Sequence, residues 1–250
     1  MAKLRSIASR HYGLMQVVVV VAGIEAYELL RQTITPNWSL AERHARDVLA
    51  VERMVHIEWE EELQRTFLRA PDLVRLMNVF YFVGHFVVTA VFFLWLYRAN
   101  RAAFRRFRNG FLTATFLAFV VHWGFPTAPP RLAGIGLEDT LRQLSHIDIG
   151  SRTSAAFTDP VAAVPSLHAG FAAGVGAGLI LYARPLLWRV IGALYPLAVM
   201  LTIVVTGNHF VFDALAGVAV MGVGFWLSEG LSRRTGGGTL GSASRGGAVR

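Results

Sequence analysis

Val164-Pro165-Ser166-Leu167-His168-Ala169-Gly170 is the stretch that decides the fold of this chain. It lies between a polar segment and a long apolar run, so Ser166 is placed to cap a helix and His168 falls in the first turn. The unpaired N–H groups and the positive dipole end of a helix start attract anions. We therefore expect Ser166, Leu167 and His168 to face a phosphate group rather than an apolar core.

A second polar stretch, Thr206-Gly207-Asn208-His209-Phe210-Val211-Phe212-Asp213, follows about forty residues later. His209 and Asp213 are four residues apart, so on a helix they share a face. The carboxylate is then able to orient the imidazole ring. This spacing predicts a histidine–aspartate pair at the start of the last apolar helix, with Asn208 as a supporting residue beside it.

The composition indicates a membrane protein. Of the 250 residues, 54% are hydrophobic, and the mean hydropathy is +0.47, which is too apolar for an ordinary soluble domain. The net charge is +8, and we attribute the basic residues to membrane topology rather than to nucleic-acid binding. The absence of cysteine excludes disulfides, thiolate zinc sites, iron–sulfur clusters and cysteine nucleophiles.

We predict an all-α, polytopic membrane helix bundle of about six transmembrane helices. A basic N-terminus (1–12) precedes the membrane domain (13–231), and a Gly/Ser-rich tail (232–250) is expected to be disordered. An amphipathic helix over 40–68 is expected on the outer membrane surface, with the acidic run around Glu60 as its solvated face. The first span is treated as a retained anchor rather than a cleaved signal peptide. The expected spans are 13–31, 73–97, 110–125, 164–182, 187–206 and 209–230.

Basic residues predict the orientation of these spans. The N-terminus, Arg98–Arg108, the loop after the fourth span and the end of the sixth span all fall on one side, which is then cytoplasmic together with both termini. The opposite face receives Arg131, His168, His209 and Asp213 from separate parts of the chain. This convergence predicts an active site on the extracytoplasmic face of the cell membrane.

Two histidines, a carboxylate and an arginine suit phosphoryl transfer through a phosphohistidine. His209 would attack phosphorus, and Asp213 would hold its tautomer. His168 would protonate the leaving oxygen and then activate water or an acceptor alcohol. Arg131 would bind the non-bridging oxygens together with N–H groups of the fourth helix. The expected partners are a phosphorylated membrane lipid and an alcohol acceptor, with no cofactor and no metal.

These motifs resemble the type 2 phosphatidic acid phosphatase superfamily. Its second motif, Pro-Ser-Gly-His, is similar to Pro165–His168, and its third ends in a histidine and aspartate spaced like His209 and Asp213. The leucine at 167 and the sequence Pro129-Pro130-Arg131-Leu132 are closer to the inositol-phosphorylceramide synthase-like branch. A lipid phosphatase or phosphotransferase is what the resemblance implies.

The polar stripe of Asn78, Tyr81 and His85 also looks like that branch, and its spacing puts all three on one helix face. A supporting role at the site and a packed polar stripe between helices are both open. The family usually carries a lysine where Gly124 stands and an arginine where Ile203 stands. Two expected cations are therefore missing, and Arg152 is a candidate replacement.

The sequence leaves three alternative functions open. A phosphodiester carries less charge than a monoester, so the missing cations favour head-group transfer from a phospholipid donor over phosphatase action. A second enzyme hypothesis makes His168, His209 and Asp213 ligands of a zinc hydrolase, although the positive helix start disfavours a cation there. The third hypothesis is a transporter whose path uses the intramembrane polar residues. The oligomeric state is not predicted.

Overall fold

The computed structural model describes residues 12–32, 37–147 and 161–236. All regular elements in these ranges are helices, and their only strand-like pairing is an isolated bridge between Thr127 and Ala162. The helices are α2 (Tyr12–Gln32), α3 (Trp38–Val55), α4 (Glu60–Phe67), α5 (Pro71–Val79), α6 (His85–Ala99), α7 (Arg101–Gly124), α8 (Thr140–Ser145), α10 (Leu167–Tyr182), α11 (Leu186–Val205) and α12 (Val211–Gly236). Two short segments, a π-helix η1 (Phe80–Gly84) and a 3₁₀ turn η2 (Pro130–Leu132), complete them.

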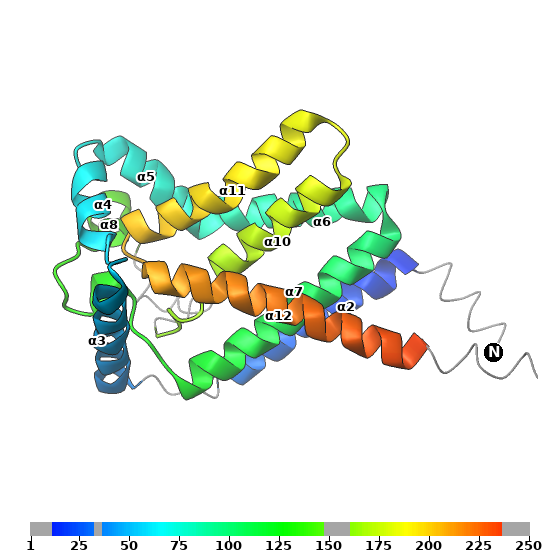
Figure 1. The fold of residues 1–250 in the computed structure, drawn as a ribbon, viewed down its shortest axis with the longest axis horizontal. Helices are drawn as coiled ribbons and strands as arrows, with labels where there is room; N and C mark the ends of the chain where they lie inside the picture. Colours follow the sequence, from blue (N-terminus) through cyan, green and yellow to red (C-terminus); the bar gives the residue numbers. More distant parts are fainter. Residues whose placement is uncertain (1–11, 33–36, 148–160, 237–250) are drawn as a thin grey trace, which may run out of the picture.

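The long helices run roughly along the longest axis of the molecule, and the short ones gather at one end (Figure 1). Helices α3, α4 and α8 lie at the end where α12 begins, whereas α12 finishes at the opposite end. Helices α3, α4 and α8 belong to segments that the sequence predicts to lie outside the membrane, so these segments gather at one end of the bundle.

Helix α10 packs closely on α11 and α12. A Cβ built on Gly217 of α12 would lie 2.0 Å from the Ser166 carbonyl oxygen, and one built on Gly170 would lie 2.8 Å from the Gly217 carbonyl oxygen. No larger side chain fits at Gly217 without moving one of these helices. The glycines at 170 and 217 therefore allow a close contact between α10 and α12.

Three helical segments are long and apolar enough to cross a membrane: Pro71–Ala99, Leu186–Val205 and Val211–Arg233. The first of them joins α5, η1 and α6. Two further apolar helices, Gly13–Tyr27 and Leu167–Tyr182, are shorter. The chain is thus a membrane-embedded helical protein, with three spans supported by length and composition.

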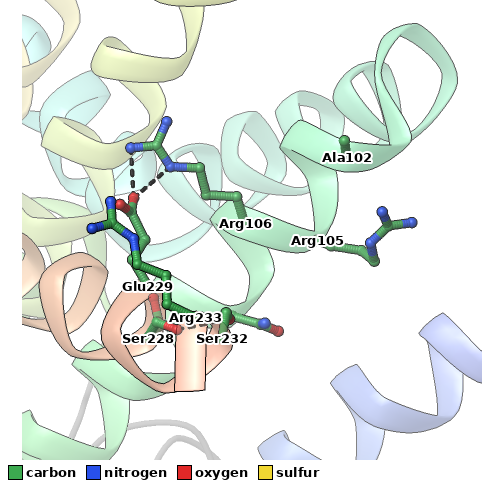
Figure 2. A pocket seen from close by; sticks show the side chains of 8 residues that line it. Ala102, Arg105, Arg106, Ser228, Glu229, Ser232 and Arg233 are labelled. Carbon is green, nitrogen blue, oxygen red and sulfur yellow. Dashed lines mark hydrogen bonds and ion pairs between the residues drawn. The ribbon is translucent and has the colours of Figure 1, made fainter. Parts of the chain in front are cut away.

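The basic residues meet at the far end of the bundle. Arg106 of α7 forms an ion pair with Glu229 of α12, with 2.5 Å between Nη2 and the Oε1 oxygen (Figure 2). Both residues line a pocket of about 330 Å³ with Arg105 and Arg233. Glu229 is sixteen residues beyond Asp213, which corresponds to about 24 Å along a helix. The basic cluster is therefore remote from the predicted catalytic residues.

Several helices differ in extent from the predicted segments. The expected helix over 40–68 is two helices, because His56 takes a left-handed conformation (φ 59°) that caps α3. The last helix begins at Val211 rather than 209 and continues to Gly236, beyond the predicted domain boundary at 231. Helix α7, which contains the predicted third span, begins at Arg101, because the Asn100 side chain accepts hydrogen bonds from two amides of its first turn. The rest of the predicted tail lies outside the described residues.

Candidate active site

His168 lies where the sequence predicts it, in the first turn of α10. Ser166 is the N-cap, and its Oγ accepts a hydrogen bond from the Ala169 amide at 3.3 Å. Ser166 is fully buried, whereas Leu167 and His168 are partly exposed. The start of α10 thus leaves Leu167 and His168 partly accessible.

His209 precedes α12 instead of belonging to it, so the predicted shared helix face is wrong. Asp213 still reaches back, because its Oδ2 accepts from the Phe210 amide at 2.9 Å and so caps the helix from within its first turn. The same oxygen lies 3.4 Å from His209 Nδ1, and the Ala163 carbonyl oxygen lies nearer, at 3.0 Å. Since both neighbours of Nδ1 are acceptors, we assign the proton to Nδ1, which leaves the lone pair on Nε2.

The rings of the two catalytic candidates are close neighbours, and Tyr81 lies beside both of them. The imidazole rings of His168 and His209 have centroids 5.7 Å apart. Tyr81 stacks on His168 with 4.3 Å between centroids and 25° between planes, and its edge approaches His209 at 6.4 Å. His168 Nε2 is buried and has no hydrogen-bond partner among the described residues. The pair therefore has one nitrogen on each ring available for proton or phosphoryl transfer.

The stripe of Asn78, Tyr81 and His85 divides between two roles, because η1 replaces regular α-helix between Phe80 and Gly84. Asn78 lies under α8, where its amide donates to the Thr140 carbonyl oxygen at 2.8 Å. Asn78 thus bonds to α8, and its supporting role at the site stays a prediction. His85, with its ring 5.1 Å from His168, joins the site and shares a 2.9 Å hydrogen bond with the Tyr195 hydroxyl.

Arg131 is buried, with its guanidinium held by two partners. Nε donates to Asn208 Oδ1 at 2.9 Å, and Nη1 lies 3.1 Å from Asp139 Oδ2. The Arg131 amide donates to the Gly207 carbonyl oxygen at 2.9 Å. Gly207 has φ +68°, and a Cβ there would lie 3.1 Å from Arg131 Cβ, so this turn requires glycine. Asn208 is accordingly a supporting residue for Arg131, beside His209.

Asp139 was not predicted, because it lies in a loop with no periodic relation to Arg131. It neutralises the only arginine that the sequence assigns to phosphate binding within the described residues. Arg152, the other candidate cation, lies outside the described residues.

Two buried carboxyl groups were also missed. Glu52 and Glu60 are 0% and 3% exposed, so Glu60 does not belong to a solvated face. Glu60 Oε1 accepts from the Val211 amide at 2.8 Å, and Glu52 Oε1 accepts from the Phe212 amide at 2.7 Å. Glu52 did carry a signal, because it continues the apolar face of Ala41, Ala45 and Val48 at helical spacing.

Burial shifts the protonation of this pair. Burial, followed by the negative charges of Glu60 and Asp213, raises the pKa of Glu52 from 4.5 to about 8, against the lowering effect of its hydrogen bond from Phe212. The pKa of Glu60 is raised as well, mainly by burial. Glu52 is therefore the proton-carrying member near neutral pH.

Within the described ranges, no three histidine, aspartate or glutamate side chains are arranged to hold a metal ion. What the site does offer is a buried imidazole pair, an ordered carboxylate and one guanidinium on an apolar helical bundle. These are the groups of a membrane-embedded phosphoryl-transfer enzyme.

Comparison with protein families identifies this class. A family model described as the PAP2 superfamily matches residues 46–227. The chain belongs to the PAP2 superfamily, whose members are phosphoesterases and phosphotransferases. Comparison with curated proteins and with solved structures gives no match. The match spans α3 to α12 and so includes all the candidate residues described here.

Proposed function

We propose that this protein is a lipid phosphatase or phosphotransferase that works through a phosphohistidine on His209. The observation that carries this proposal is the closeness of the His168 and His209 rings, whose centroids are 5.7 Å apart, with Tyr81 stacked on His168. A phosphorus atom between the two rings would meet a nucleophile on one side and a proton donor on the other. Membership of the PAP2 superfamily supports the same chemistry.

In the first step, His209 Nε2 attacks phosphorus. The N–P bond forms, the bond from phosphorus to the leaving oxygen breaks, and protonated His168 gives its proton to that oxygen. The Ala163 carbonyl and Asp213 hold the Nδ1 proton and stabilise the positive charge that develops on the ring. Arg131 and the amides at the start of α10 would bind the non-bridging oxygens.

In the second step, neutral His168 takes a proton from water or from an acceptor alcohol. The resulting oxygen attacks phosphorus and the N–P bond breaks. With a monoester donor, water yields free phosphate and an alcohol yields a new phosphate ester. With a diester donor, water yields the phosphorylated head group and an alcohol yields a new phosphodiester. Both outcomes use the same side chains, so the acceptor alone separates a phosphatase from a transferase.

The finer assignment is head-group transfer of the inositol-phosphorylceramide synthase type. Its support is electrostatic, because Arg131 is already paired with Asp139 and the two family cations are replaced by Gly124 and Ile203. A phosphodiester donor, with a single negative charge, suits such a site better than a doubly charged monoester.

We also propose six spans with both termini in the cytoplasm, which puts the site at the extracytoplasmic face of the cell membrane. The ion pair between Arg106 and Glu229 supports this orientation, because it joins two basic segments at one end of the bundle (Figure 2). The start of α12, which carries Asp213, lies at the other end (Figure 1).

The test uses purified protein in detergent with labelled phosphatidic acid and labelled phosphatidylinositol, each with and without a lipid alcohol. Phosphate release from the monoester would establish a phosphatase, and an acceptor-dependent new phospholipid would establish a transferase. His209→Ala is the control, and it must abolish either product. Equal activity of the variant and the wild-type protein would contradict the proposed function.

A further inference from the structure

Three consecutive amides at the start of α12 are bound by three carboxyl groups from three helices. The Phe210 amide donates to Asp213 of α12, the Val211 amide to Glu60 of α4 and the Phe212 amide to Glu52 of α3. A helix start usually satisfies such amides with one local cap or with water. Here two of the three partners come from a segment about 150 residues earlier.

Helix capping alone does not explain this arrangement. Glu52 and Glu60 are buried almost completely, and burying carboxyl groups is costly compared with a serine or threonine cap. Their partners, Val211 and Phe212, directly follow the His209 turn and precede Asp213. The carboxyl pair therefore holds the few residues that set the direction of the His209 ring.

We propose that Glu52 and Glu60 are positioning residues of the active site, which fix the first turn of α12 and so hold His209 and Asp213 opposite His168. This inference rests on the proposed function. It assigns the segment 38–67 a part in the reaction, because that segment supplies both carboxyl groups. Both act through the backbone, because their hydrogen bonds are to the amides of Val211 and Phe212.

The charge of the pair fits a site for anions. The ionisable groups that act on Glu52 are Glu60 from α4 and Asp213 from α12, and both are acidic. A neutral Glu52 binds the Phe212 amide without adding a third negative charge behind the phosphate. Deprotonation would add that charge, so turnover should fall as the pH rises through about 8.

The experiment measures structure and activity on the same full-length variants in detergent. Glu60→Ala removes the acceptor for the Val211 amide, whereas Glu60→Gln keeps an acceptor oxygen. Glu61→Ala is the matched control, because Glu61 is the exposed neighbour on the same helix. Amide hydrogen exchange follows Val211 and Phe212, and turnover of phosphatidic acid and phosphatidylinositol gives kcat and KM.

We expect Glu60→Ala to speed exchange at Val211 and to lower kcat by about tenfold or more, with a much smaller change in KM, since misorientation of a reacting group acts on kcat. Glu60→Gln should restore most of the rate, and Glu61→Ala should match the wild-type protein. Glu52→Gln should flatten the loss of turnover above pH 8, and this readout does not depend on whether Glu60→Ala folds.

Faster exchange in Glu60→Ala without a fall in kcat would make the pair purely structural and overturn the proposal. If Glu52→Gln lost turnover above pH 8 as the wild-type protein does, the loss would not come from the charge of Glu52. Failure of the proposed function has a different signature: His209→Ala would then turn over the probes as fast as the wild-type protein, whatever the exchange at Val211.

Discussion

The backbone amide of Ser166 donates a hydrogen bond to the backbone carbonyl oxygen of Asp213, 3.0 Å away. This bond joins the cap of α10, which carries His168, to the first turn of α12, which follows His209. The His122 ring, 3.1 Å from the Pro165 carbonyl oxygen, holds the same segment from the side of α7. The two predicted motifs are therefore one backbone unit, and the separation of their histidines is set by main-chain contacts.

Gly217→Ala should disturb that unit. Its Cβ would lie 2.0 Å from the Ser166 carbonyl oxygen, and overpacking of this kind costs about 1–3 kcal/mol. We expect a lower unfolding temperature in detergent and a lower kcat. Gly222→Ala is the matched control, because a Cβ at this position of α12 meets nothing within 4 Å. A Gly217→Ala protein as stable and as active as the control would contradict the close helix contact.

Arg131→Lys should weaken the binding of tetrahedral oxyanions. Lysine cannot make the two directed contacts, to Asn208 and Asp139, that hold the guanidinium. We expect the inhibition constant of orthovanadate to rise by about tenfold. This rise corresponds to the loss of one charge-assisted hydrogen bond, which is worth roughly 1.5 kcal/mol. Arg142→Lys, an exposed position on α8, serves as the control. If orthovanadate inhibited both variants equally, Arg131 would not belong to the phosphate site.

The pKa of Glu52 makes folding stability depend on pH. The folded protein keeps the Glu52 proton up to about pH 8, whereas the unfolded chain loses it near the ordinary value of 4.5. The folded state thus binds more protons between these values, so stability falls as the pH rises from about 4.5 to 8. Glu52→Gln should reduce that fall in thermal unfolding measured at several pH values. Glu61 is exposed, so Glu61→Gln should leave the pH dependence of stability unchanged. An identical pH dependence in the wild-type protein and both variants would count against a buried, protonated Glu52.

Removal of metal ions should leave the activity intact. The proposed steps use only groups of the protein itself, with His209 and His168 as the reacting side chains, and two acceptors already hold His209 Nδ1. Turnover after prolonged dialysis against EDTA is expected to equal that of untreated protein. A loss that added zinc restores would instead favour the hypothesis that His168, His209 and Asp213 are metal ligands.

The local features of the fold were predictable from sequence, whereas the long-range contacts were not. Ser166 as a helix cap and the first-turn position of His168 follow from residue preference over a few positions, and the structure confirms both. The helical, membrane-embedded class follows from composition, and three apolar spans support it. The six-span count and the orientation stay predictions.

The misses have physical reasons. The spacing of Asn78, Tyr81 and His85 predicts one face of a regular α-helix, but the π-helix η1 interrupts that helix from Phe80 to Gly84. Asn78, in α5, bonds to α8. Glu60 stands in an acidic run that usually marks a solvated face, and its burial depends on α4 meeting α12 about 150 residues later. Such a contact is fixed by tertiary packing, which single-sequence periodicity does not contain.

The most direct test of the central claim is to look for phosphate on His209. The protein is mixed with ³²P-labelled phosphatidic acid or phosphatidylinositol labelled at phosphorus, quenched in base, and mapped by mass spectrometry. We predict an acid-labile, base-stable label on His209 that His209→Ala abolishes. The label should persist longer in His168→Ala, which cannot activate the acceptor. Turnover without any label on His209, or with the label on His168, would contradict the account.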